Sequence, residues 1–133
     1  MKHKFMLDTD HVSYALRGEG GVGDAILAHR PSELCLSSIT VAELRFGAEK
    51  RGSRRLHGLI DAFTGNLDIL PFDVEAAVQY GRLAAKLAAR GTPIGQLDAL
   101  IAAHALVAGV SLVTNNQRHF SRIRGLKLEN WAQ

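Results

Sequence analysis

Phe5-Met6-Leu7-Asp8-Thr9-Asp10 joins a short apolar run to acidic residues near the start of the 133-residue chain. Three apolar residues closed by a polar one are typical of a short buried strand. Asp8 would lie directly at the end of that strand, where a carboxylate costs free energy unless a neighbouring group compensates it. We therefore expect the first strand at residues 5–7 and take Asp8 as a candidate functional residue.

The rest of the chain continues this alternation of strand and helix. Further apolar strands are expected at residues 34–36, 69–70 and 110–113, with an edge strand at 126–128. Helices are expected at residues 10–17, 22–29, 38–50, 53–64, 73–89 and 96–108. Short apolar strands that alternate with helices predict a parallel sheet covered on both faces. The length suits a single domain spanning residues 1–133.

Composition places the chain among ordinary globular proteins. Hydrophobic residues make up 47% of the sequence and charged residues 22%, which excludes a disordered or fibrous chain. Cys35 is the one cysteine, so an internal disulfide is impossible, and its apolar neighbours predict a small buried side chain. Neither a membrane-spanning run nor a signal peptide is recognisable, so we expect a cytoplasmic protein without membrane contact.

The strand ends tell where to look for a functional site. In parallel sheets such a site lies outside the carboxyl ends of the strands. In this sequence those ends are Asp8, the pair Ser37-Ser38 and the segment Thr114-Asn115-Asn116.

Most of the 13 acidic residues have structural explanations. Asp10, Asp24 and Asp73 stand at expected helix starts, where carboxylates cap free N–H groups. Glu49 can pair with Arg45 one helical turn earlier. Asp8, Glu43 and Asp98 remain as residues that such explanations do not fully cover.

Glu43 has two interpretations that the sequence leaves open. It shares the apolar stripe of its helix with Ile39 and Phe46, which favours a buried functional carboxylate. Thr40-Val41-Ala42-Glu43 also fits a capping box, with Ile39 and Leu44 as the accompanying hydrophobic staple.

Asp98 is ambiguous in the same way. It heads an apolar stripe with Ile94 and Ile101, yet an acid in the first turn of a helix is also favoured by the helix dipole. Together, three buried carboxylates would repel one another and take up protons unless a cation neutralised them. Oxygen-only ligands favour Mg²⁺ or Mn²⁺, and such a site suits cleavage of phosphodiester bonds.

Zinc is not expected at this site. The six histidines form no close pair, and neither an HExxH motif nor a Cys/His cluster is present. His104 is most simply a structural helix residue, and His119 a surface residue or a substrate contact.

Basic residues gather in two segments of this chain, whose net charge is +3 and whose pI is about 9.4. Residues 50–55 lie between two expected helices, and residues 118–127 follow the last long one. Either segment could be a solvated surface, contact the phosphates of a nucleic acid, or face a protein partner.

The chain resembles PIN-domain nucleases, and in particular the VapC toxins of bacterial type II toxin–antitoxin pairs. The similar segments span nearly the whole chain in the expected order and spacing. They are Phe5-Met-Leu-Asp8-Thr-Asp10, Ser38-Ile-Thr-Val-Ala-Glu43-Leu-Arg-Phe-Gly47, Asp98-Ala-Leu-Ile-Ala-Ala-His-Ala105, Val113-Thr-Asn-Asn116-Gln-Arg-His-Phe120 and Leu128-Glu-Asn-Trp131.

The resemblance implies a three-layer α/β/α sandwich and an endoribonuclease that uses Mg²⁺ or Mn²⁺. It implies that Asp8, Glu43 and Asp98 are catalytic and bind the metal, while Thr9 and Thr114 support them through hydroxyl hydrogen bonds. It further implies structured RNA, often transfer RNA, as substrate, a VapB-like antitoxin as partner, and a homodimer.

Asn116 departs from the family pattern, because many PIN domains carry a fourth acid at that position. An amide can accept a hydrogen bond or orient water but supplies no charge, so one metal is expected rather than two. Asp10 stands where relatives often have Asn.

Two other functions compete with the nuclease. Asp8-Thr9-Asp10 after a strand also resembles the nucleophile motif of haloacid-dehalogenase-like phosphatases, although His11-Val12 follows instead of Gly-Thr. In a non-catalytic interaction domain, the acids would merely cap helices.

Overall fold

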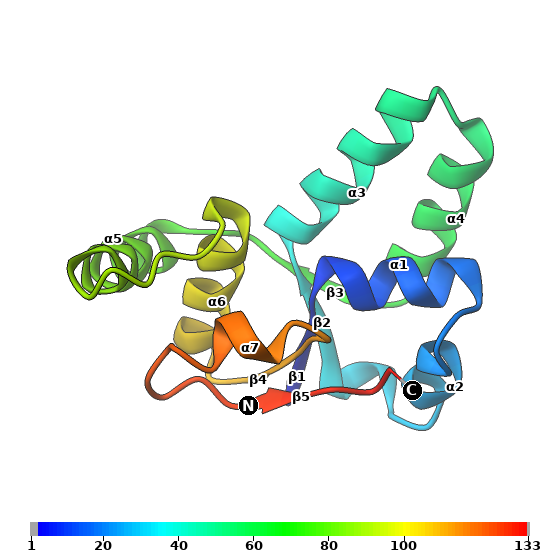
Figure 1. Ribbon diagram of the computed structural model, residues 1–133. Helices are drawn as coiled ribbons and strands as arrows, with labels where there is room; N and C mark the ends of the chain where they lie inside the picture. Colours follow the sequence, from blue (N-terminus) through cyan, green and yellow to red (C-terminus); the bar gives the residue numbers. More distant parts are fainter. Residues whose placement is uncertain (1–2, 133) are drawn as a thin grey trace.

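Five short strands form a parallel sheet in residues 3–132, the part of the chain that this computed structural model describes (Figure 1). They are β1 (Phe5–Leu7), β2 (Leu34–Ser37), β3 (Asp68–Leu70), β4 (Ser111–Val113) and β5 (Leu128–Glu129). The spatial order is β3-β2-β1-β4-β5, so the first strand lies at the centre. Phe5 is opposite Leu34 on one side and Ser111 on the other. The predicted parallel sheet is confirmed, with strand ends displaced by one or two residues.

Helices connect the strands. They are α1 (Thr9–Arg17), α2 (Val22–Leu27), α3 (Ser38–Arg51), α4 (Arg54–Thr64), α5 (Val74–Ala89), α6 (Gln96–Ala108) and α7 (Gln117–Phe120), with a 3₁₀ turn, η1, at Pro31–Glu33. The six predicted helices are all present. Neither α7 nor η1 was predicted. None of the described helices is long and apolar enough to cross a bilayer.

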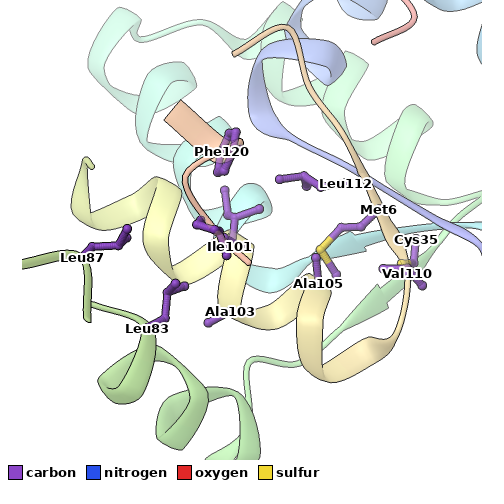
Figure 2. Packing of buried hydrophobic residues seen from close by; sticks show 12 residues of the cluster. Met6, Cys35, Leu83, Leu87, Ile101, Ala103, Ala105, Val110, Leu112 and Phe120 are labelled. Atoms are coloured by element: carbon purple, nitrogen blue, oxygen red, sulfur yellow. The ribbon is translucent and has the colours of Figure 1, made fainter. Parts of the chain in front are cut away.

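Two apolar clusters cover the two faces of the sheet, because neighbouring strand residues point to opposite sides. Met6, Cys35 and Leu112 pack against α5 and α6, from which Leu83, Leu87, Ile101 and Ala105 point inward (Figure 2). Leu7, Leu36 and Val113 face the other way and pack against residues of α1, α3 and α4. The expected α/β/α sandwich is therefore present. Cys35 is fully buried, as predicted, and burial raises the pKa of its thiol to about 12.

Several helix starts differ from the prediction. Asp8, not Asp10, caps α1, which begins at Thr9. Of the two interpretations of Glu43, the capping box at Thr40–Glu43 is wrong, because α3 already begins at Ser38 and the hydroxyl of Ser37 accepts a hydrogen bond from the Ile39 N–H. The predicted cap of α5 by Asp73 is confirmed.

The predicted pairing of Glu49 with Arg45 is also wrong. Arg45 instead donates to Asp61 and to the backbone carbonyl of His57, both on the neighbouring helix α4. Glu49 lies 2.8 Å from Nε2 of His57. These contacts link α3 to α4 rather than stabilising α3 alone.

Candidate functional site

Asp8 stands at the carboxyl end of the central strand, with only 5% of its surface exposed. Its N–H donates to the carbonyl of Val113 at 3.0 Å, which ties the ends of β1 and β4 together. Its Oδ1 accepts from the N–H of His11 at 2.9 Å. Among the described residues, Oδ2 has no hydrogen-bond donor, so this oxygen remains free for a ligand.

Glu43 enters the site from α3, the helix that follows β2. The hydroxyl of Thr9 donates to its Oε1 at 2.5 Å. This contact joins the start of α1 to the middle of α3. Glu43 is thus held by a side chain from another helix instead of capping its own.

Asp98 lies in the first turn of α6, where no side chain caps the helix. Its Oδ2 lies 3.5 Å from the side-chain nitrogen of Asn116, which follows β4. Asn116 also donates its amide to Nδ1 of His119 at 3.0 Å, and its backbone N–H donates to the hydroxyl of Thr114 at 2.9 Å. Thr114 therefore acts on Asp98 only indirectly, because its hydroxyl positions Asn116. Within residues 3–132, the Thr114 hydroxyl hydrogen-bonds no acidic side chain.

Electrostatics connect these carboxylates. Burial raises the pKa of Glu43, the hydrogen bond from Thr9 opposes this rise, and the charges of Asp98, Asp10 and Asp8 add to it. Burial also raises the pKa of Asp98, and Asp8 and Asp10 raise it further, against the opposing effects of His119 and Asn116. The three predicted acids therefore share one electrostatic environment.

Asp10 is the site residue that sequence reasoning missed, because it was interpreted as a helix cap. Although Asp10 is exposed at the surface, partial desolvation by its neighbours and the charge of Asp8 raise its pKa, whereas His11 and Arg17 lower it. The position beside Asp8 in the motif could have indicated this role. The site therefore has four carboxylates, since Asp10 supplies a negative charge that Asn116 does not.

The donor chemistry of the site fits a hydrated divalent cation. Asp8, Glu43 and Asp98 each have one oxygen engaged by the protein and a second that accepts no hydrogen bond within residues 3–132. In that same part of the chain, no three acidic, histidine or cysteine side chains form a group that could hold a metal ion between them. Mg²⁺ suits such an open arrangement, because it usually retains several waters and uses only one or two carboxylates.

Three histidines lie near the site or its supports. His11 is fully buried; its Nε2 accepts from the Trp131 N–H, and its Nδ1 lies 3.6 Å from Oδ1 of Asp8. His104 lies with Nδ1 2.7 Å from the Ser37 hydroxyl, and burial lowers its pKa. His104 is thus the structural helix residue that was expected, while His119 reaches Asp98 through Asn116.

Ser37 and Ser38, at the end of β2, have structural roles. Ser37 caps α3, and the Ser38 hydroxyl accepts from the N–H of Phe72 at 3.0 Å. Neither serine hydrogen-bonds an acid of the site in the described residues.

A cavity of about 150 Å³ adjoins Glu43, between α1, α3 and α4. Arg17 and Arg51 both line it, so cationic side chains stand next to the acidic cluster. Arg51 belongs to the basic segment 50–55 that the sequence singled out.

Comparison with known proteins gives a consistent result. The model of the PIN domain family matches residues 5–126. The tRNA(fMet)-specific endonuclease VapC of Salmonella typhimurium is 39% identical over 97% of this chain and 98% of its own length. The ribonuclease VapC2 of Haemophilus influenzae is 40% identical over the same shares.

Solved structures agree with these matches. A chain in the structure of DNA-bound VapBC from Salmonella typhimurium has a TM-score of 0.90 and 38% identity, covering 97% of this chain and 98% of that one. A chain in the structure of VapBC2 from Rickettsia felis has a TM-score of 0.87 and 34% identity, covering 96% and 98%. The chain therefore belongs to the PIN-domain family and is a homologue of the VapC ribonucleases.

Proposed function

We propose that this chain is an Mg²⁺- or Mn²⁺-dependent endoribonuclease, the toxin of a VapBC-type pair, and that it cleaves structured RNA of the transfer RNA class. The observation that carries the proposal is the group of coupled carboxylates Asp8, Asp10, Glu43 and Asp98 at the carboxyl edge of the sheet. Two further facts support it: the relatives are named as ribonucleases, and some are named for a tRNA.

Asp8 and Asp98 would hold the divalent cation, and Glu43 would orient a water beside it. The bound cation would stabilise negative charge on the phosphate and lower the pKa of water near it. Its own charge would also offset the burial and the mutual repulsion that together raise the pKa values of Glu43 and Asp98.

The protein's own part in hydrolysis is to orient groups and move protons. Glu43 is held at Oε1 by Thr9, so Oε2 is free to accept a proton from the attacking water. The water oxygen forms a bond to phosphorus while a phosphorus–oxygen bond of the RNA breaks, and the departing oxygen takes a proton from solvent. Arg17 and Arg51, in the cavity beside Glu43, would hold the substrate phosphate against the repulsion of the acids.

A VapB-like antitoxin is the proposed partner, because several of the most similar structures are VapBC assemblies. We also propose a homodimer. Val74 and Val78, one turn apart on α5, are 77% and 50% exposed, which is unusual for apolar side chains on one helix face unless another surface covers them.

The two competing functions have weaker support. The family match is to nucleases, not to phosphatases that use an aspartate nucleophile. The interaction-domain alternative required Glu43 to cap a helix, and Glu43 instead bonds Thr9.

The decisive experiment incubates the purified chain with a tRNA pool and sequences the RNA ends, with Mg²⁺ or with EDTA. Cleavage at defined positions is expected with Mg²⁺ and not with EDTA. Asp8→Asn should abolish cleavage yet keep the fold, because Asn caps a helix about as well as Asp. Metal-dependent cleavage by a folded Asp8→Asn variant would contradict the assignment.

A further inference from the structure

A second cationic surface lies away from the acidic cluster. It is a groove of about 550 Å³ between α5, the end of α6 and the segment after α7, which we name the α5 groove. Arg82 and Lys86 line it from α5, Arg90 lines it from the position that follows the helix, and Arg124 lines it from the segment after α7. Leu83 and Ile123, both buried, form its apolar floor.

The charge of the α5 groove is not balanced by nearby acids. All four cationic side chains belong to exposed residues, and no acidic residue lines the groove. None of the four forms an ion pair with another described residue. Arg90 instead donates to the backbone carbonyl of Arg122 at 3.2 Å. The groove therefore concentrates positive potential on one side of the molecule.

The three cations of α5 form a regular row. Arg82, Lys86 and Arg90 are spaced by four residues, which corresponds to a rise of about 6 Å per step along the helix. Like charges at this spacing destabilise a helix. Lys86 and Arg90 lie at the C-terminal end of α5, where the helix dipole also favours cations, but that effect does not account for Arg82. A row of cations along a hollow that no acidic residue lines fits a polyanionic ligand.

We propose that the α5 groove binds the phosphodiester backbone of the RNA substrate at a distance from the cleavage site. This inference rests on the proposed ribonuclease function. Asp98 and Leu106 stand at the two ends of α6, about 12 Å apart along the helix axis, and Leu106 lines the groove. Figure 1 shows α5 on the far side of α6 from α1 and α3. A folded RNA can therefore contact the groove while one of its phosphates lies at the acidic cluster.

Binding is the appropriate readout, because it does not depend on the metal. The probe is a fluorescently labelled tRNA pool in EDTA, titrated with the full-length chain over a range of salt concentrations. The groove variant is Arg82→Gln with Lys86→Gln. The matched control is Lys4→Gln with Arg30→Gln, which removes two exposed cations beside Glu33 that belong to neither basic segment of the sequence.

The groove variant should bind at least about 10-fold more weakly than wild type near 0.1 M salt, and the salt slope should fall by about 1.5, as for two lost phosphate contacts. The affinity of the Lys4/Arg30 control should differ clearly less from that of wild type. The melting temperature of the groove variant should be unchanged or higher, because a row of like charges has been removed. Weak binding would then not reflect unfolding.

The outcomes separate this inference from the proposed function. If wild type cleaves tRNA but the groove variant binds no more weakly than the Lys4/Arg30 control, the groove assignment is overturned and the ribonuclease stands. If wild type binds tRNA through the groove but cleaves no RNA, the ribonuclease proposal fails. A groove variant that keeps its RNA affinity and loses its antitoxin would assign the groove to a protein partner, which also overturns the RNA assignment.

Discussion

Asp98 illustrates how the site works against the stability of the fold. Its pKa is raised because burial and the charges of Asp8 and Asp10 outweigh the favourable contacts to His119 and Asn116. A carboxyl whose pKa is higher in the folded state stabilises the fold only while protonated, so this contribution is lost as pH rises through the folded value. Near neutral pH the charge of Asp98 therefore costs stability.

Asp98→Asn should accordingly raise stability while abolishing cleavage. We expect a gain of up to about 1 kcal/mol, which corresponds to a melting temperature higher by about 3–5 °C in a domain of this size. Thermal unfolding of wild type and variant at pH 7 in EDTA measures this effect. A variant less stable than wild type would show that the charge of Asp98 is net favourable.

For single residues, the position relative to strands and helices predicted site membership better than the residue type did. Asp8 was identifiable because it ends an apolar strand and because sites lie at strand ends. Asp10 and Glu43 were ambiguous because helix-start patterns depend on which residue is the cap. Because Asp8 caps α1 and Ser37 caps α3, neither Asp10 nor Glu43 caps a helix, and both carboxylates can contribute to the site.

Among the elements, α6 is the helix most firmly enclosed by the rest of the molecule. Five consecutive residues from Ile101 to Ala105 are buried, and Figure 1 shows the helix between α5 and the sheet. Its His104 contacts Ser37, which also caps α3. One hydroxyl thus connects the end of β2, the start of α3 and the middle of α6, and all three position the acids.

Ser37→Ala should therefore cost more than the loss of an ordinary cap. A typical N-cap contributes about 1 kcal/mol, and a buried polar group left without its partner costs about a further 1–3 kcal/mol. Ser53→Ala, which removes the cap of α4, is the matched control. Urea unfolding should show the larger loss for Ser37→Ala; equal losses would mean that the His104 contact adds nothing.

His104 also gives a pH dependence that can be measured. Burial lowers its pKa, so the folded state resists protonation while the unfolded state takes up a proton. This contribution to stability is complete above the ordinary histidine pKa of about 6.5 and is lost as pH falls through the lower, folded value. Urea unfolding between pH 7.5 and 5 (roughly the histidine range) should show a steeper loss for wild type than for His104→Gln. Identical profiles would contradict this cause.

Most helices could be predicted because apolar residues recur in them at helical spacing over several turns. The structure adds α7 and η1, of four and three residues, which are too short to show such a period. The edge strand β5 lies at Leu128–Glu129 instead of 126–128, since an edge strand has few apolar contacts to set its position.

For the whole molecule, the exposed face of α5 predicts self-association. If Val74 and Val78 lie in a dimer interface, Val78→Glu should place a charge in an apolar contact and shift the protein from dimer to monomer. Light scattering after size-exclusion chromatography measures the mass directly. Leu27→Glu, on α2, exchanges another exposed apolar residue and serves as control. A wild-type monomer, or a dimer unaffected by Val78→Glu, would reject this interface.

The α5 groove could not be predicted at this scale. Arg124 was noticed within a basic tail segment, but the cations of α5 had no neighbour in sequence that marked them. Only the packing of α5 beside α6 and the segment after α7 brings the two sets together. A surface assembled from segments far apart in the sequence can be recognised only once the tertiary structure is known.

The strand order has a consequence for the synthesis of the protein in the cell. Central strand β1 needs β4 as its second neighbour, and β4 is made only after more than 100 residues have been added. A nascent chain on the ribosome carries Asp8 and Glu43 early, but it lacks Asp98 and the strand that orders the end of β1. The acidic cluster of this PIN-domain protein therefore forms only after α6 and β4 have been synthesised.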